Sequence, residues 1–284
     1  MWGVFELAVG MNILGVVRNG GVGLINTLNR IEELRKRLPE SRVIIATDNN
    51  TDGTDLVLSE YGGQVSDTQI IRLDEQLATV SERVERIAAA RNATLGKVFG
   101  DLKPFELTLM LDLDGPNASL RVDDVLRSIR RPIDWGGIFA NQQEAYYDLY
   151  ALRCKGWCES DVWQQIRNTK KPILYRKRHR KALVTKLVYD RQYQIPLDTP
   201  PIPVHSAFGG LGIYRTDLLR NVMYTTRDTA GQLTCEHVSL NRAICERGAK
   251  LFIDPRLLTS SQREHLGPTS GSPLPDHLRE QFAR

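Results

Sequence analysis

Apolar residues in the first 115 positions alternate between short continuous runs and stretches with helical spacing. Residues 12–17 and 43–47 are compact runs of the kind that form buried strands, whereas residues 23–37 place aliphatic side chains three or four positions apart. Strands that alternate with amphipathic helices are typical of a parallel sheet covered by helices. The pattern therefore predicts an α/β fold.

The same pattern extends over much of the remaining chain. Residues 81–99 are expected to form a helix that begins at Ser81, and residues 236–247 another that Gly248 ends. Further elements are expected as strands at residues 70–73, 108–114, 137–140 and 250–253, a strand within the glycine-rich stretch 206–215, and a helix at residues 122–129.

Three stretches depart from this alternation. Residues 1–17 are apolar but carry Glu6 and lack a basic start, which favours a first strand over a signal peptide. Residues 161–204 read as a basic, irregular loop, and the Ser, Pro and Gly content of residues 259–284 predicts a surface tail. No apolar run reaches the roughly 18 residues that a membrane-spanning helix needs.

The stretch Leu111-Asp112-Leu113-Asp114 places two carboxylates one residue apart at the end of an apolar strand. Both would point to the same side of the strand, where they repel one another unless a cation neutralises them. Aspartates at a strand end also serve as plain turn formers. The pair alone leaves a metal site and a structural turn equally open.

Arg91 falls on the buried face of the helix expected at residues 81–99, because it lies seven positions after Val84 and four after Ile87. An arginine on an inward face needs an anion. Its partner could be a structural carboxylate, a ligand phosphate, or the carboxylates at positions 112 and 114.

The order of these features resembles the GT-A glycosyltransferases over about residues 12–258. The polar loop from Thr47 to Thr54 looks like their nucleotide-binding loop, and Arg91-Asn92 looks like their pair before the carboxylate motif. Three further stretches are similar to the branch with fungal capsule-type mannosyltransferases and collagen galactosyltransferases: Asn141-Gln142 with Tyr146-Tyr147-Asp148-Leu149, Phe208-Gly209-Gly210, and Cys235-Glu236-His237-Val238.

The resemblance implies a GT-A, Rossmann-like mixed sheet, mainly parallel and flanked by helices. It implies one catalytic domain at residues 1–258, in which residues 1–115 bind the nucleotide and residues 116–258 the acceptor. The implied function is metal-dependent transfer of a hexose from a nucleotide-diphosphate sugar to a glycan or lipid-linked acceptor. The implied donor-binding residues are Arg18, Asp48, Asn49, Asp52, Arg91, Asp112, Gly209 and Gly210.

The same resemblance assigns the metal to Asp112, Asp114 and His237. A neutral imidazole among the ligands favours Mn²⁺ over Mg²⁺, although a histidine at a helix start can also be a simple cap. Glu236 stands where inverting relatives have the first acid of a Glu-Asp pair and could accept the proton of the acceptor hydroxyl. His237 in place of that Asp leaves the stereochemical outcome open, and Glu236 could instead complement the helix dipole.

Residues 170–186 lie in a stretch with nine Lys or Arg and no acid between Asp161 and Asp190. The favoured interpretation is a solvated loop. The second is peripheral contact with an anionic membrane or with a lipid-pyrophosphate acceptor. Binding of nucleic acid is the third. The four cysteines match no common zinc spacing. A reduced, cytoplasmic protein, peripheral at the inner membrane face if it contacts lipid, is therefore expected.

Two other functions remain open on the sequence alone. A sugar-nucleotide pyrophosphorylase would share the sheet and the metal carboxylates, and the loop Arg18-Asn19-Gly20-Gly21 faintly matches its glycine-rich loop. A binding module that keeps the fold without turnover is the second alternative, against which the presence of both Asp112 and Asp114 argues.

Overall fold

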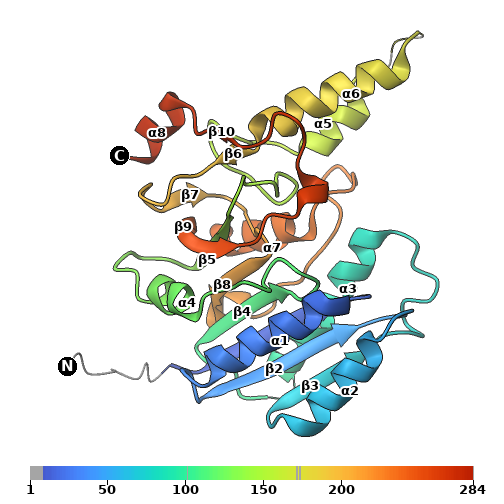
Figure 1. The fold of residues 1–284 in the computed structure, drawn as a ribbon, viewed down its shortest axis with the longest axis vertical. Coiled ribbons are helices and arrows are strands. Elements are labelled where there is room, and N and C mark those ends of the chain that lie inside the picture. Colours follow the sequence, from blue (N-terminus) through green and yellow to red (C-terminus); the bar gives the residue numbers. More distant parts are fainter. Residues whose placement is uncertain (1–8, 101, 171, 173, 284) are drawn as a thin grey trace.

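The computed structural model describes residues 9–100, 102–170, 172 and 174–283, so the interpretation of residues 1–8 as part of a first strand lies outside it. The described residues form an eight-stranded sheet with helices on both faces (Figure 1). Its strands are β1 (Met11–Val17), β2 (Ser41–Thr47), β3 (Thr68–Arg72), β4 (Leu107–Asp112), β5 (Gly137–Gln142), β7 (Ile202–Val204), β8 (Leu211–Arg215) and β9 (Leu251–Thr259). The helices are α1 (Gly21–Arg35), α2 (Thr54–Gln64), α3 (Arg83–Gly100), α4 (Val122–Ile129), α5 (Val162–Asn168), α6 (Arg176–Leu187), α7 (Glu236–Glu246) and α8 (Asp276–Phe282).

The strand order is β3-β2-β1-β4-β8-β5-β9-β7. The pairs β3-β2, β2-β1, β1-β4 and β5-β9 are parallel, whereas β8 runs antiparallel to both its neighbours and β7 antiparallel to β9. The expected mixed, mainly parallel α/β sheet is therefore confirmed.

Alternating side chains divide the core into two layers, one on each face of the sheet. On β1, Ile13 joins the layer under α1, α2 and α4, while its neighbour Leu14 joins the layer under α3 and α7. The aliphatic stripe expected on α1 is buried in the first layer, as Leu24, Leu28, Ile31 and Leu34. The hydrophobic pattern thus sets which face of each helix meets the sheet.

The parallel strands bring three loops to one edge of the sheet. Val17 pairs with Thr47, and Val16 pairs with Asp112, so β1, β2 and β4 all end at the same level. α1 approaches this edge closely, because a Cβ on Gly23 would lie 2.6 Å from the carbonyl oxygen of Asp114. Open α/β sheets bind ligands beyond the carboxyl ends of such strands.

Two stretches differ from the sequence-based expectation at their boundaries. β4 ends at Asp112, so Asp114 lies in the turn that follows instead of in the strand. β9 runs on from the expected end at Ile253 to Thr259, across a shift in its pairing with β5 after Ala140. Pro255 lies at this irregularity, which is where a strand tolerates proline.

α2 was not expected from the sequence. It contains the pair Gly62-Gly63, which weakens helical propensity, and few of its residues are buried. The interpretation of residues 161–204 as an irregular loop is wrong, since α5 and α6 form there. α6 has no fully buried residue, and its apolar side chains Leu183, Val184 and Leu187 lie only in its second half, where they pack partly buried against the core. Such a short apolar pattern after a run of basic residues is a weak signal of a helix.

The expected surface tail is also a misinterpretation. Residues 272–273 form the short strand β10 (Ser272–Pro273), which pairs with β6 (Tyr193–Gln194), and α8 follows. Leu274, Leu278 and Phe282 are buried against the layer that contains α7. Leu278 and Phe282, four residues apart, form the apolar face of α8, while Leu274 lies just before the helix. The surrounding Ser, Pro and Gly residues made this short apolar pattern hard to recognise.

Candidate active site

One cleft of about 680 Å³ opens at the carboxyl edge of β1, β2 and β4, between α3 and the start of α7. It is lined by eight of the residues that the sequence pointed to: Arg18, Asp48, Arg91, Asp112, Asp114, Gly210, Glu236 and His237. Residues spread over 220 positions of the chain therefore meet in one cavity. Its lining does not include Asn49, Asp52 or Gly209.

Arg91 lies at the centre of this cleft and is only 5% exposed. Its Nη2 donates to Asp112 Oδ1 at 2.7 Å, and its Nε donates to Glu236 Oε1 at 3.2 Å. Burial alone would lower the pKa of Arg91, but the charges of Asp112 and Glu236 outweigh it and raise the pKa above its usual value. The anion that an inward arginine requires is thus a pair of carboxylates, one of which belongs to the Asp112-Leu113-Asp114 stretch.

Asp114 differs from Asp112 in having no ion pair among the residues described. Its side chain reaches solvent, yet partial desolvation and, next, the charge of Asp112 raise its pKa. Arg83 and Arg91 act in the opposite direction. An added cation at this place would relieve the repulsion between the two carboxylates.

His237 is 2% exposed and stacks on Phe208, with 3.7 Å between the ring centroids. Neither ring nitrogen has a hydrogen-bond partner, and Nε2 lies 3.6 Å from Glu236 Oε1. Burial, aided by the charge of Arg91, holds the pKa of His237 well below its usual value, so the imidazole is neutral. A buried neutral imidazole with a free nitrogen suits a metal ion or a ligand hydroxyl.

These acids and His237 do not form a complete metal cage by themselves. Within residues 9–283, apart from the three undescribed positions 101, 171 and 173, no three His, Cys, Asp or Glu side chains converge as a metal site. Mg²⁺ and similar ions are often held by one or two carboxylates and completed by substrate phosphates. The arrangement around Asp112 and Asp114 corresponds to this open kind of site.

The loop after β2 is held mainly by contacts within the protein. Asp48 forms an ion pair with Arg86, whose Nη1 also donates to the carbonyls of Leu77 and Val80 at 3.0 and 3.1 Å. Asp52 accepts from the backbone amide of Thr54 at 3.0 Å and thereby caps α2. Asp52 thus has a structural role here, whereas Asp48 lines the cleft.

Asn49 does not line the cleft but contacts residues that do, since its carbonyl accepts from Arg18 Nε at 3.3 Å. Its Nδ2 donates to the carbonyl of Asp74 at 3.1 Å, and its backbone has a positive φ of 43°. Asparagine tolerates this conformation better than most residues do. The side chain therefore fixes the loop after β2 to the segment after β3.

The glycines before β8 serve close packing. Gly209 has a φ of 66°, and a Cβ there would lie 2.6 Å from the carbonyl oxygen of Ala140. Gly210 has a φ of 85°, and its carbonyl accepts from the backbone amide of Asp112 at 3.0 Å. These contacts tie the start of β8 to the carboxylate stretch.

The sequence-based list missed several residues that line the cleft, namely Arg83, Arg86, Tyr147, Asp148, Tyr150, Phe208 and Cys235. Asp148 Oδ2 accepts from the amide of Gly209 at 3.0 Å, and Oδ1 accepts from the amide of Ala151 at 3.2 Å. Burial is the main cause that raises the pKa of Asp148 to about 6. The stretch around Asp148 carried a family resemblance, but no spacing rule pointed to this carboxylate.

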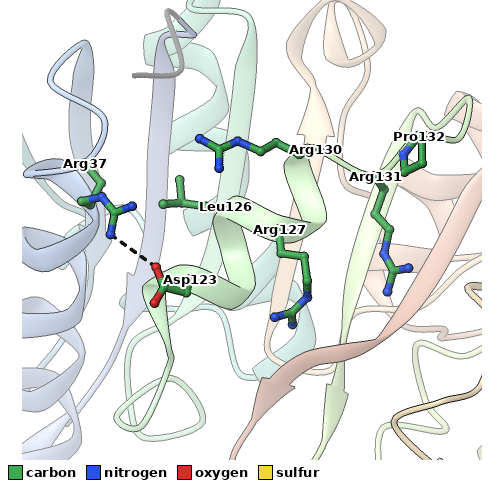
Figure 2. A pocket seen from close by; sticks show the side chains of 7 residues that line it. All are labelled: Arg37, Asp123, Leu126, Arg127, Arg130, Arg131 and Pro132. Atoms are coloured by element: carbon green, nitrogen blue, oxygen red, sulfur yellow. Dashed lines mark hydrogen bonds and ion pairs between the residues drawn. The ribbon is translucent and has the colours of Figure 1, made fainter. Parts of the chain in front are cut away.

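A second cavity, of about 420 Å³, lies at the opposite edge of the sheet beside α4 and is rich in arginine. Figure 2 shows Arg37, just after α1, reaching toward Asp123 on α4, at 3.3 Å. Arg127 pairs with Asp124, and Arg131 pairs with the buried Asp254 at 2.6 Å. These arginines are already engaged by the protein, so the cavity is a structural feature.

No family model and no curated protein matches the sequence. Solved structures do match. The mannosyltransferase PcManGT from Pyrobaculum calidifontis, in complex with GDP-Man and Mn²⁺, has a TM-score of 0.50 and 13% identity. GalNAc-T7 with UDP, GalNAc and Mn²⁺ has a TM-score of 0.51 and 16% identity.

The aligned region covers 90% of this chain and 59% of the mannosyltransferase, and 93% of this chain and 45% of GalNAc-T7. The fold is therefore the GT-A fold of nucleotide-sugar glycosyltransferases, as the sequence indicated. The chain spans only about half the length of these two structures. At such identities the likeness establishes the fold, and the chemistry has to be argued from the cleft.

Replacing Arg91 should strongly destabilise the protein. In Arg91→Ala the carboxylates of Asp112 and Glu236 lose their shared cation, and breaking a buried pair costs about 3–5 kcal/mol. Urea unfolding in the absence of divalent metal measures the difference. Arg37→Ala, which removes an exposed pair, should cost no more than about 1 kcal/mol, and an equally small cost for Arg91→Ala would contradict the buried network.

Asp148 should titrate near pH 6. Because the folded state raises its pKa from 3.8 to about 6, the folded protein binds this proton more tightly than the unfolded chain does. The free energy of unfolding should therefore fall as pH rises from about 4 to about 6, and Asp148→Asn should remove that fall. Carbon-13 NMR of the carboxyl group, recorded without metal, checks the pKa; a midpoint near 4 would refute it.

Proposed function

We propose that this protein is a metal-dependent glycosyltransferase that moves a hexose from a nucleotide-diphosphate sugar to a glycan or lipid-linked acceptor. The observation that carries the proposal is the meeting of Asp112, Asp114 and Arg91 in one cleft at the carboxyl edge of the parallel strands. The likeness to a GDP-mannose complex and a UDP complex supports the donor class.

The cleft offers complementary charge for a nucleotide diphosphate. Arg18 and Arg83 line it without an ion pair to any described carboxylate, so they can meet phosphate oxygens. We assign the nucleotide to residues 1–115, which supply Arg18, Asp48 and Asp112, and the acceptor to residues 116–258, which supply Glu236. Gly210, although it lies in the second half, is assigned to the donor. Asn49, Asp52 and Gly209 would support the donor site through the backbone that they hold.

We assign the divalent cation, Mn²⁺ or Mg²⁺, to Asp112 and Asp114. These two side chains and His237 do not converge as a three-residue site without the cation, so we propose that His237 would join as a further ligand only when the cation is bound. The raised pKa of Asp114 and the two unpartnered nitrogens of His237 fit this role. When bound there, the cation would neutralise charge on the leaving diphosphate. The imidazole favours Mn²⁺, as Mg²⁺ prefers oxygen ligands.

Transfer requires a new bond from the acceptor oxygen to the anomeric carbon and loss of the bond from that carbon to the diphosphate. We assign Glu236 to accept the proton of the acceptor hydroxyl. Arg91 holds Glu236 Oε1, and this contact positions the carboxylate while leaving Oε2 for the acceptor. Cys235 Sγ donates to that oxygen at 3.5 Å, and the acceptor hydroxyl would replace this weak hydrogen bond.

Among the described residues no helix is long and apolar enough to cross a membrane. We propose that residues 170–186 make peripheral contact with an anionic membrane, which would bring a lipid-linked acceptor to the cleft. The acid-free run of basic residues in this stretch supports the contact.

The donor site is tested by Asp114→Asn and Asp112→Asn. Both variants should lose Mn²⁺-dependent binding of UDP or GDP, because an amide cannot replace a charged metal ligand. Titration calorimetry with a panel of nucleotide diphosphates measures the binding. A nucleotide that binds should also raise the free energy of unfolding of wild type by about 2.7 kcal/mol when its concentration is about 100 times its dissociation constant. Asp123→Asn, beside the second cavity, should bind like wild type. Unchanged metal dependence in both cleft variants would refute the proposed function.

The role of Glu236 is tested by Glu236→Gln. Turnover should fall by about 10²-fold or more while donor affinity is kept, because general base catalysis is lost and the side chain still accepts from Arg91. NMR of the anomeric proton of the product gives an independent check. An inverted configuration agrees with a single displacement, and a retained one would exclude Glu236 as a simple base.

A further inference from the structure

α5 and α6 stand together at one end of the molecule, away from the sheet (Figure 1). Between them lies a cavity of about 550 Å³. Trp163, Ile166 and Leu183 give it an apolar wall. Its basic lining comes from both helices and consists of Arg167, Arg176, Lys177, His179 and Arg180. Apolar surface beneath a group of cations is the pattern that an amphiphilic anion would match.

The cations of α6 form no ion pair with any described residue. Arg176 and Arg180 stand four residues apart, as do Lys177 and Lys181, so like charges repel along the exposed helix. A helix with this arrangement gains stability when an external anion binds.

The residues just before α6, at the tip of the hairpin that α5 and α6 form, add an independent observation. Leu174 and Tyr175, directly before α6, are 70% and 79% exposed. Exposed apolar and aromatic residues beside a basic helix are typical of segments that enter the headgroup region of a bilayer. A nucleic acid would contact the basic side chains through its phosphates. It would leave Leu174, Tyr175 and the apolar wall of the cavity without a binding partner.

The hairpin is anchored to the start of α7. Asp161 caps α5 by accepting from the amides of Trp163 and Gln164, and its Oδ2 accepts from Thr234 Oγ1 at 3.2 Å. Arg167 donates to the carbonyl of Leu233 at 2.9 Å. The chain continues from Leu233 and Thr234 directly into Cys235 and Glu236, so hydrogen bonds join α5 to the segment that leads into the cleft.

We propose that the α5–α6 cavity seats one acidic phospholipid of a bilayer. Arg176, Lys177 and Arg180 would bind its phosphate, while the acyl chain would lie against Trp163, Ile166 and Leu183. The inference rests on the proposed membrane contact of residues 170–186 and adds a defined lipid site to it. It does not depend on the chemistry in the cleft.

Vesicle sedimentation with two matched variants tests the site. The rim variant replaces Arg176, Lys177 and Arg180 by Ser, and the control variant replaces Arg178, Lys181 and Lys186, which are exposed on the same helix but do not line the cavity. On vesicles of phosphatidylcholine with an equal amount of phosphatidylglycerol, the rim variant should lose about 10²-fold in partitioning. The control should lose clearly less.

Equal losses by the two variants would overturn the cavity site and leave a diffuse charge effect. If wild type itself fails to bind these vesicles more than pure phosphatidylcholine, the membrane contact fails together with the lipid site, while nucleotide binding in the cleft is untouched. Full competition by inorganic phosphate or by a short DNA duplex would also overturn the lipid assignment.

Quenching of tryptophan fluorescence by brominated acyl chains tests the tail directly. Phosphatidylglycerol with brominated chains should quench wild type, and Trp163→Phe should lose most of that quenching, because Trp163 lines the cavity. The same quenching in both proteins would overturn the placement of the acyl chain between α5 and α6.

Discussion

One buried cation fixes the geometry of the cleft. A guanidinium is planar and carries five donors, so Arg91 can serve the carboxylates of Asp112 and Glu236 together. The three residues lie on α3, β4 and α7, and none of these elements can shift without leaving a buried charge unpaired. Phe208 belongs to the same arrangement. The centroid of its ring lies 4.7 Å from Arg91 Cζ, and the ring stacks on His237.

The sheet supplies the second constraint. Parallel pairing of β1, β2 and β4 sends their loops to one edge, and the antiparallel β8 enters the sheet at that edge with Gly210 beside Asp112. The acidic stretch and the glycine stretch are therefore neighbours, although about a hundred residues separate them. The absence of a side chain on Gly23 lets α1 close the same edge from one face.

Much of this could be predicted from local patterns. The stripe on α1 and the inward position of Arg91 follow from side-chain periodicity, and the carboxylates at the end of β4 and in the turn after it follow from the apolar run that precedes them. The partner of Arg91 could not be predicted in the same way, because Glu236 lies 145 positions away and only the fold brings it near. Asp148 and Arg86 were missed for a related reason, since each owes its place to a loop contact and not to a spacing.

The failures also have physical causes. α6 has apolar residues only in its second half, and α2 contains a glycine pair, so hydrophobic periodicity gave a weak signal for both helices. α8 has a buried face of only two residues, Leu278 and Phe282, within a stretch whose composition suggested disorder. Composition reports an average, whereas a short helix needs only a few apolar side chains in the right places.

β7 has a consequence for how the protein behaves at high concentration. It is the last strand of the sheet, consists of Ile202–Val204 only, and has Pro203 at its middle position. An open sheet edge can recruit a strand from another molecule, and a short edge strand whose central residue lacks an N–H offers little to pair with. The β7 edge of the sheet is thus protected against edge-to-edge aggregation by the composition of the strand itself.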